Sequence, residues 1–216
     1  MSRNSVAPPE PPRDCPLCPR LVTFRQSNAA AHPGFFNAPV PSFGPPDARL
    51  LVVGLAPGLK GANRTGRPFT GDYAGDLLYE CLIEAGLARG SYRASPEDGL
   101  TLKGCMITNA VRCVPPENKP TGEEARTCLG FLKARIAALP ELRALFALGR
   151  IAHDNVLAAL AVRRAAHPFA HGAVHILEGG LTLVDSYHCS RYNTNTGRLT
   201  PQMFREALAK AVAASR

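Results

Sequence analysis

The sequence predicts an α/β fold in three layers, in which helices cover both faces of a central, mostly parallel sheet of four to five strands. Two observations lead to this prediction. Short apolar runs alternate with segments of helical periodicity, and 216 residues are enough for one domain with a sizeable core but cramped for two. Residues 1–12 are rich in proline and small polar residues, so we expect a disordered tail before a single domain over residues 13–216.

The first half of the domain begins with a loop-like stretch and then alternates strand and helix. Residues 20–47 hold many Pro, Gly and Asn residues and are predicted to be irregular. Residues 49–55 form an apolar run typical of a buried strand. A helix is expected from about residue 73 to 88, and residues 103–110 are the second predicted strand.

The second half continues the alternation. A helix is predicted over residues 121–139, with Glu123 and Glu124 favourably placed at the positive end of its dipole. The last helix has Thr200 as its N-cap and Pro201 at its first position, and runs to about residue 214. Between these helices we predict a strand at 143–148, a helix at 150–160, and strands at 173–177 and 181–186 that can pair as a hairpin across 178–180.

The balance of charge favours a polyanionic partner. The chain carries 25 Lys and Arg residues against 17 Asp and Glu residues, a formal net charge of +8, although charge alone is a weak indication of nucleic-acid binding. We find no apolar run of about 18 residues and no apolar signal-peptide region, so we expect neither a membrane span nor export. An odd number of cysteines, seven, without a signal sequence favours the reducing cytoplasm, where thiols bind metals.

Four of the cysteines predict a metal site. Cys15 and Cys18 form a C-x2-C pair, the usual half of a four-thiolate zinc or iron–sulfur site, while Cys113 and Cys128 follow singly far downstream. Zinc ribbons contain two such C-x2-C pairs, whereas this chain has one pair and two single cysteines. The spacing therefore favours an iron–sulfur site over zinc. The alternative is four ordinary buried thiols, since cysteine is among the most buried residue types.

The other three cysteines have less specific surroundings. Cys81 lies at helical spacing with Leu77, Leu78 and Leu82, and Cys105 lies in a strand-like run, so both are predicted to be core residues. Cys189 adjoins His188 and could be read as a nucleophile, but no local signature supports that role.

Three segments are expected to meet at one edge of the sheet. In parallel α/β sheets the binding crevice lies beyond the carboxyl ends of the strands, which are followed here by residues 54–72, 109–113 and 187–200. The first segment contains neither G-x-x-x-x-G-K-[ST] nor G-x-G-x-x-G, so its glycines do not indicate a nucleotide-phosphate loop. Its one aromatic residue, Phe69, either anchors the loop in the core or faces a ligand.

Four motifs in order carry a resemblance to a known family. They are GLAPG from residue 54, GANRTGRPFTGD from residue 61, TNAVRC from residue 108, and HCSRYNTNTGRLT from residue 188. These motifs resemble those of the uracil-DNA glycosylase superfamily, and most closely those of the iron–sulfur type-b enzymes, family five. Cys15, Cys18, Cys113 and Cys128 fall where those enzymes hold a [4Fe–4S] cluster, so the resemblance implies that cofactor, with a structural or DNA-orienting role.

The resemblance implies three catalytic residues, Asp72, His188 and Asn109. A glycosylase extrudes its target nucleotide and holds the base in a pocket, so Phe69 resembles the ring on which the base stacks and Asn109 the amide that recognises uracil. His188 is expected to donate to uracil O2 as negative charge develops. Asp72 is the candidate for positioning water or stabilising the sugar cation, with Asp76 as the alternative carboxylate and helix capping as the structural alternative.

The resemblance also assigns the pocket walls and the DNA contacts. Leu55, Ala56 and Gly58 belong to the motif that lines the base pocket, and Ser190 and Arg191 are expected to hold the flipped nucleotide, Ser190 through a phosphate. Tyr192 and Arg191 are expected to act as a wedge that enters or flanks the minor groove. Tyr192 and Cys189 both depart from the usual family motif. Basic residues on the crevice loops are expected to follow the DNA phosphates: Lys60, Arg64, Arg67, Arg112, Lys119, Arg191 and Arg198.

The function implied is that of a monofunctional glycosylase. It is expected to remove uracil, and other deaminated bases such as hypoxanthine, from DNA and to leave an abasic site. We expect a cytoplasmic monomer that binds DNA containing such bases. We expect no binding to a membrane. Two alternatives remain open: a non-catalytic iron–sulfur protein that binds uracil DNA, and a member that traps uracil DNA covalently. The second needs a histidine in a basic insertion, and neither His153 nor His167 lies in one.

Overall fold

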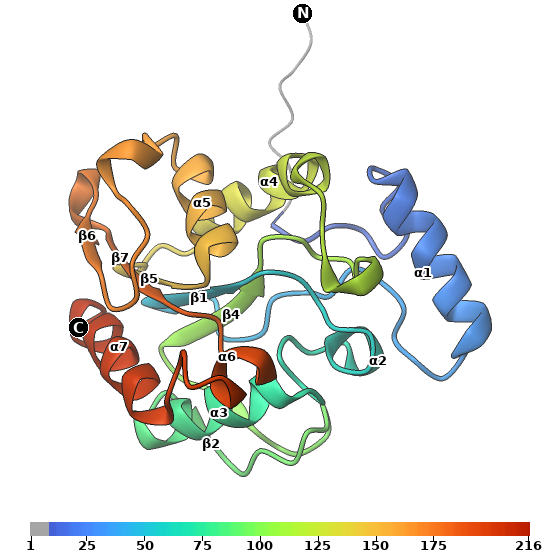
Figure 1. The fold of residues 1–216 in the computed structure, drawn as a ribbon, viewed down its shortest axis with the longest axis horizontal. Coiled ribbons are helices and arrows are strands. Elements are labelled where there is room, and N and C mark those ends of the chain that lie inside the picture. Colours follow the sequence, from blue (N-terminus) through green and yellow to red (C-terminus); the bar gives the residue numbers. More distant parts are fainter. Residues whose placement is uncertain (1–8) are drawn as a thin grey trace, which may run out of the picture.

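Five strands form the middle layer of the computed structural model, which describes residues 9–216 (Figure 1). In spatial order they are β4 (Cys105–Asn109), β1 (Leu50–Gly54), β5 (Ala144–Leu148), β7 (Thr182–Ser186) and β6 (Val174–Ile176). β1 pairs in parallel with β4 and β5, and β5 with β7, whereas β6 runs antiparallel to β7. The predicted fold class is therefore confirmed, including the hairpin.

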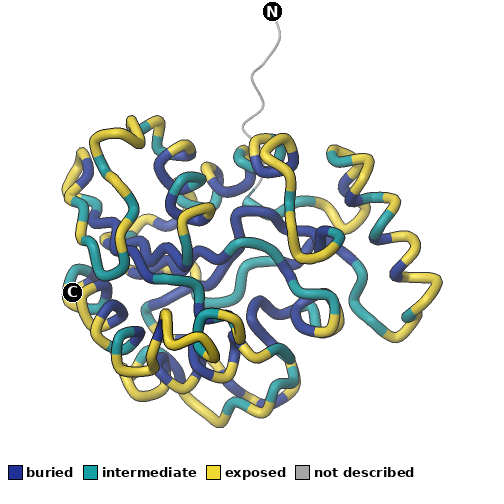
Figure 2. The backbone as a smooth tube through the Cα atoms, viewed as in Figure 1, coloured by how far each residue is buried: buried dark blue, intermediate teal, exposed yellow. Residues whose placement is uncertain are grey.

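Two pairs of helices cover the two faces of the sheet. α3 (Tyr73–Glu84) and α7 (Pro201–Ala214) pack on one face, and α4 (Gly122–Ala137) and α5 (Arg150–Ala159) on the other. Along β1, Leu50 and Val52 join the first core while Leu51 and Val53 join the second. Figure 2 shows the central strands as the buried part of the molecule, which explains their continuous apolar sequences.

The prediction of a loop over residues 20–47 is wrong in its first part, because α1 (Pro19–Ala31) is a helix of 13 residues. Pro19 stands at its first position, where proline is favoured. The side chains that α1 buries are Leu21, Arg25 and Asn28, so two of the three are polar and the sequence shows no apolar stripe. Besides the packing of Leu21, ion pairs and hydrogen bonds from Arg20 and Arg25 join this helix to the domain.

Part of the predicted tail lies against the domain. Residues 1–8 of the predicted tail lie outside the described residues, but residues 9–12 contact the domain. Glu10 accepts hydrogen bonds from Arg112 and Arg135, and the Pro9 carbonyl accepts one from Arg112. Residues 10–12 of the predicted tail therefore include side-chain contacts with the domain, while the single-domain boundary at residue 13 stays a prediction.

Short elements complete the structure. They are α2 (Ala62–Thr65), α6 (Arg191–Asn195), the pair β2 (Ala88–Arg89) and β3 (Thr101–Leu102), and three 3₁₀ turns, η1 (Pro116–Asn118), η2 (Arg164–Ala166) and η3 (Glu178–Gly180). α3 ends at Glu84 rather than near residue 88 because Gly86 adopts a φ of +74° and turns the chain into β2. Across the described residues, none of the helices has the length and apolarity needed to cross a bilayer.

Candidate active site and cysteine cluster

A crevice of about 850 Å³ lies beyond the carboxyl ends of β1 and β7. Residues predicted for the site meet in it: its walls include Asp72, His188 and the backbone of the first motif. A smaller inner pocket adjoins it, sharing Asp72 and His188 and adding Phe69 and Asn109. The segments 54–72, 109–113 and 187–200 are thus brought together, as the parallel topology requires.

Phe69 forms one wall of the inner pocket and is 6% exposed. Its ring centroid lies 5.9 Å from that of His188, with 27° between the planes. The backbone of Phe69 has a φ of +54°, a conformation that a bulky residue rarely adopts and that costs about 1–3 kcal/mol. Interactions with the surrounding residues must therefore stabilise this backbone conformation.

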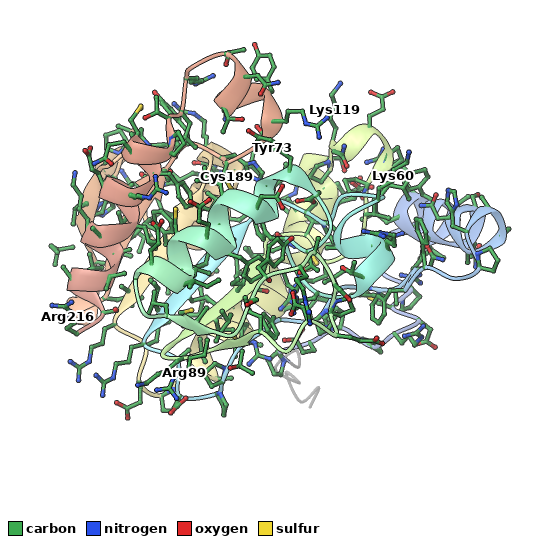
Figure 3. All side chains as sticks on the ribbon, turned by 90° about the horizontal axis from the view of Figure 1, so that it is seen from below. Lys60, Tyr73, Arg89, Lys119, Cys189 and Arg216 are labelled. Carbon is green, nitrogen blue, oxygen red and sulfur yellow. The ribbon has the colours of Figure 1, made fainter. Side chains whose placement is uncertain are left out.

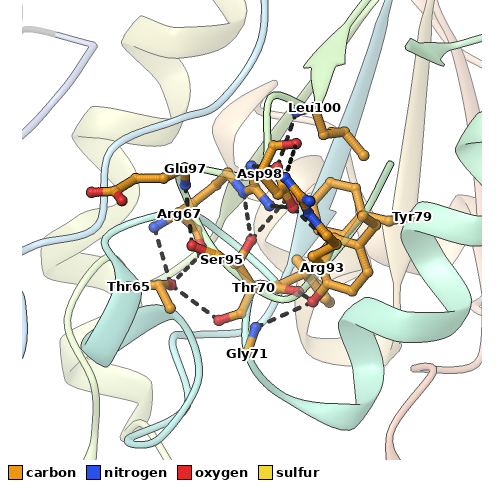
Figure 4. A network of polar contacts seen from close by, with 12 residues as sticks. Thr65, Arg67, Thr70, Gly71, Tyr79, Arg93, Ser95, Glu97, Asp98 and Leu100 are labelled. Carbon is orange, nitrogen blue, oxygen red and sulfur yellow. Dashed lines mark hydrogen bonds and ion pairs between the residues drawn. The ribbon is translucent and has the colours of Figure 1, made fainter. Parts of the chain in front are cut away.

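A buried polar network supplies that support (Figure 4). Arg67 makes two hydrogen bonds of 2.8 Å to the carboxylate oxygens of Asp98 and one of 2.7 Å to Thr70 Oγ1. The hydroxyl of Tyr79 donates to the Pro68 carbonyl at 2.7 Å, and Tyr92 donates to the carbonyl of Phe69 itself. The hydrogen bonds from Arg67 lower the pKa of Asp98 below its ordinary value, so the pair stays ionised and holds the turn.

Asn109, the last residue of β4, forms the floor of the inner pocket beside Gly54. It is 3% exposed, and its Oδ1 atom is buried without a hydrogen-bond partner among the described residues. An orphaned buried acceptor costs about 1–3 kcal/mol. A Cβ atom on Gly54 would lie 2.4 Å from Asn109 Oδ1 and 2.5 Å from Phe69 Cζ, so glycine is needed for these groups to approach each other.

His188 follows β7 and faces both the crevice and the inner pocket. Burial penalises the charged imidazolium and lowers the pKa of His188 to about 4. The ring is therefore neutral near pH 7 and retains one N–H group as a donor. The side chain of Asn193 donates to the carbonyl of His188 at 2.8 Å and fixes the backbone from which this ring projects.

Asp72 both caps a helix and lines the candidate site. It is the N-cap of α3, where its Oδ1 accepts from the Gly75 amide at 3.3 Å, and it also lines both pockets. Burial raises the pKa of the Asp72 carboxyl above its ordinary value, and the backbone amides of Gly75 and Ala74 offset part of that rise. Asp76 lines the outer crevice only and is exposed.

The remaining predicted wall residues lie where the motifs placed them. Leu55, Ala56, Gly58, Ser190 and Arg191 all line the outer crevice. Ser190 is also the N-cap of α6. Tyr192, which follows, is 71% exposed.

Two further crevice residues escaped the sequence analysis. Asn118 lies in the crevice wall with a φ of +57°, and Tyr73 packs its ring under the guanidinium of Arg191, 5.3 Å from the ring centroid. The sequence contains little indication of Asn118, because its loop carries none of the four motifs and reaches the crevice only in the folded chain. Tyr73 was visible as an aromatic next to Asp72.

Two of the seven predicted DNA-contacting cations are wrong. Arg67 is paired with Asp98, and Arg112, 1% exposed, is paired with Glu10. The position of an arginine in a loop of the sequence does not by itself show whether its side chain will be buried or exposed. The other five are exposed: Lys60, Arg64, Lys119, Arg191 and Arg198. Figure 3 shows Lys60, Tyr73 and Lys119 on one side of the molecule, away from Arg89 and Arg216.

The four cysteines of the predicted metal site converge from three segments. Cys15 and Cys18 precede α1, Cys113 follows β4, and Cys128 lies in α4. They line one pocket with apolar neighbours that include Leu21, Val111 and Phe131, and no carboxylate or imidazole among the described residues lines it. Four sulfurs in apolar surroundings are the donor set of an iron–sulfur or zinc site.

The electrostatics of this pocket suit a bound cation or cluster. Burial raises the pKa of Cys18 to about 11 and that of Cys113 to about 12, so four thiolates there need compensating positive charge. Arg25 supplies part of it, donating to Cys113 Sγ at 3.6 Å and to the Cys15 carbonyl at 3.2 Å. Hydrogen bonds to ligand sulfurs are typical of iron–sulfur sites, so the residues present fit such a group.

The other three cysteines belong to the core, as predicted for Cys81 and Cys105. Cys189 is fully buried, and its thiol donates to the Ala74 carbonyl at 3.4 Å. Burial also raises the pKa of Cys189. A buried, protonated thiol is a poor nucleophile, so Cys189 packs the loop beside His188 instead of reacting.

Sequence comparison identifies the family to which this pocket belongs. The family model of the uracil-DNA glycosylase superfamily matches residues 41–212, which is most of the chain. The chain belongs to this superfamily. The family that the motifs predicted is therefore confirmed.

Members of the superfamily are similar to this chain over almost its whole length. The type-5 uracil-DNA glycosylase of Thermus thermophilus is 51% identical over 91% of this chain and 92% of its own length. The type-5 enzyme of Mycobacterium leprae is 44% identical over 89% and 90%, and that of Pyrobaculum aerophilum 41% over 93% and 88%.

Proposed function

We propose that this protein is a monofunctional uracil-DNA glycosylase, which hydrolyses the N-glycosidic bond of uracil in DNA and leaves an abasic site. The observation that carries the proposal is the buried Oδ1 of Asn109, which has no hydrogen-bond partner among residues 9–216 and lies close to Gly54. A polar atom left unpaired inside a pocket is costly. A base that donates a hydrogen bond there would remove this cost.

The amide of Asn109 distinguishes uracil from cytosine by polarity. Uracil offers N3–H as a donor and O4 as an acceptor, which match the Oδ1 and Nδ2 atoms of an asparagine. Cytosine offers the reverse at both positions, so each mismatched buried group costs about 1–3 kcal/mol. The flipped base would stack on the ring of Phe69, whose peptide the Arg67–Asp98 network holds in a strained conformation.

Two further residues would stabilise the charges that develop as the bond breaks. The departing base becomes anionic, and the neutral imidazole of His188 can donate its N–H to uracil O2. The sugar becomes cationic, and the carboxylate of Asp72, held against the backbone of Gly58 and Gly61, would stabilise it and position the attacking water. Asp76 is the less favourable candidate because it is exposed and lies outside the inner pocket.

The pocket favours hydrolysis and a broad choice of deaminated bases. Lys60 is the one lysine among the described residues that line the crevice, and its side chain is exposed, which argues against imine formation with the sugar. Leu55 and Ala56 give the first motif an apolar character. We propose that hypoxanthine and related bases are accepted as well, and that the enzyme acts as a monomer.

One gel assay distinguishes this proposal from its two alternatives. Purified protein is incubated with an end-labelled uracil duplex, and the DNA is analysed with and without alkali. A glycosylase without lyase activity gives strand cleavage only after alkali. A non-catalytic DNA-binding protein gives none, and a covalently trapping protein gives a slow-migrating adduct. Full activity of an Asp72→Ala, His188→Ala double variant would contradict the assigned catalytic residues.

We also propose that Cys15, Cys18, Cys113 and Cys128 hold a [4Fe–4S] cluster. When bound, such a cluster would join three segments covalently and fix the chain after Asn109. Support comes from the convergence of the four sulfurs and from the hydrogen bond that Arg25 donates to Cys113. Iron and sulfide analysis should find about four of each per chain, with less in Cys128→Ser and no change in Cys81→Ser. A colourless zinc protein would contradict the proposal.

A further inference from the structure

A second cluster of metal-binding side chains lies outside the crevice, on the other side of the sheet from α3. His153 of α5, His175 of β6 and Asp185 of β7 each offer one ligand atom, and these atoms all lie within 4.8 Å of one another. His153 Nδ1 lies 2.8 Å from Asp185 Oδ1, and His175 Nε2 lies 3.1 Å from Asp185 Oδ2. The uracil site uses none of these residues.

The carboxylate at the centre of this cluster requires a cation. Asp185 is fully buried, and in the described part of the chain its two oxygens are hydrogen-bonded to these two imidazoles and to no lysine or arginine. An isolated buried carboxylate is very unfavourable unless it is neutralised or coordinates a metal. A metal ion bound by Asp185 and the two imidazoles would neutralise this buried charge.

The surroundings of His153 have the arrangement usual for a metal ligand. Its Nε2 lies 2.9 Å from the carbonyl oxygen of His167, which can only accept a hydrogen bond, so the proton of a neutral ring sits on Nε2. The lone pair of Nδ1 is then on the side of Asp185, and a metal ion bound by both Nδ1 and Oδ1 would remove the repulsion between their lone pairs. Histidine ligands commonly donate their second N–H to a backbone carbonyl in this way.

We propose that His153, His175 and Asp185 form a binding site for a divalent transition metal ion of the zinc class. Two nitrogens and a carboxylate oxygen are donors that zinc accepts. Donor atoms bound at about 2.0–2.2 Å in a tetrahedral site lie roughly 3.3–3.6 Å apart, so the separations of 2.8 and 3.1 Å seen here would widen by a few tenths of an ångström on binding. The ring of His167 lies nearby, its centroid 5.4 Å from that of His175.

The proposed metal would have a structural role. β6 is a three-residue edge strand whose Val174 and Ile176 are exposed, so apolar packing contributes little to holding it. β6 and β7 lie side by side (Figure 1). A metal bound by all three residues would join both strands to α5. Since β7 leads directly into His188, the site would also steady the strand that carries a catalytic residue.

The experiment measures zinc binding by the full-length, cluster-loaded protein. The protein is freed of loosely bound metal with a chelator and titrated with ZnCl₂ in competition with a chromophoric zinc chelator. The variants are His175→Ala, His153→Gln, and His32→Ala as the matched histidine control. All seven cysteines are retained in every variant, so zinc bound to thiols is common to all of them and cancels in the comparison.

The wild type and His32→Ala are expected to bind one more zinc ion per chain than either site variant. Removal of a ligand should weaken this site by at least roughly 100-fold, since even outer-shell partners are worth about 10–100-fold. Zinc should also raise the Tm of the wild type and leave that of His175→Ala unchanged. Equal zinc stoichiometry in wild type and both site variants would overturn the proposal.

Discussion

Gly54 determines how closely Phe69 and Asn109, the two side chains proposed to contact the base, approach each other. A Cβ atom at this position would overlap Phe69 Cζ and Asn109 Oδ1, at 2.5 and 2.4 Å. Gly54→Ala should therefore displace both groups, with an overpacking cost of about 1–3 kcal/mol and a fall of roughly 10²-fold in kcat/KM, as expected for a misplacement near 1 Å.

The control for this prediction is Gly34→Ala. An added Cβ there meets no atom within 4 Å, so stability and base release should equal those of the wild type. Thermal unfolding and initial rates of uracil release measure both effects. Wild-type rates in Gly54→Ala would show that Phe69 and Asn109 do not have to keep this geometry.

The acidic limb of the pH profile should report Asp72. Burial raises the pKa of this carboxyl, and its catalytic form is the anion, so kcat/KM should rise with pH through that raised value. His188, with a pKa of about 4, stays neutral above about pH 5 and adds no limb there. Asp72→Asn should remove the limb and lower the rate by about 10²–10⁴-fold.

Asp76→Asn is the matched control, because Asp76 lies one helical turn away and is exposed. It should retain both the rate and the limb. The profiles are obtained from single-turnover rates between pH 4 and 9, with circular dichroism to confirm folding at each end. Loss of the limb in Asp76→Asn instead would transfer the role to that residue.

The sequence was most informative for side chains inside contiguous motifs. Phe69, Asp72, Asn109 and His188 were predicted from motif position and all line the inner pocket. Burial of single charged residues was not predictable: Arg67 belongs to a motif, yet its partner Asp98 lies in a segment without one. Such pairings depend on which distant loops come together in the folded chain, and a local sequence pattern does not predict this.

At the scale of elements, the turn over residues 67–72 depends on a clamp from residues 92–98. Asp98→Ala would leave the buried guanidinium of Arg67 without its partner, which costs about 3–5 kcal/mol. Since Tyr92 and Thr70 belong to the same network, the strained Phe69 peptide should also relax and base release should slow. Thermal and urea unfolding measure the first effect, and initial rates the second.

The control is Glu80→Ala, which breaks an exposed ion pair with Arg205. Exposed pairs contribute little, so this variant should unfold at the wild-type temperature within error. If Asp98→Ala behaved like Glu80→Ala, the clamp would have no role in stability.

Elements with apolar periodicity were predicted within a few residues, and α1 was missed for a physical reason. The strands β1, β4, β5 and β7 are buried throughout, so their apolar runs are unambiguous. α1 is held by polar contacts instead, including the pair of Arg20 with Glu124 at 2.7 Å. A helix of this kind shows no stripe, and only Pro19 marked its start.

At the scale of the whole molecule, the exposed cations around the crevice should determine the salt dependence of DNA binding. Each phosphate contact contributes about 0.9 to the slope of log K against log salt. Lys119→Ala and Arg198→Ala should therefore each reduce that slope by up to about 0.9. Arg89→Ala is the control, since Arg89 is exposed on another side of the molecule (Figure 3). Equal losses in all three variants would contradict a crevice-centred DNA path.

The measurement that tests the central claim most directly is the single-turnover release of uracil from a duplex by the wild type and by Asn109→Ala. The wild type should leave alkali-labile abasic sites. Asn109→Ala should be slower by roughly 10–100-fold, because the base then lacks partners worth about 1–3 kcal/mol each, while its DNA affinity and salt slope stay unchanged. Release by Asn109→Ala at the wild-type rate would contradict the claim that the inner pocket beside Phe69 and His188 recognises the base.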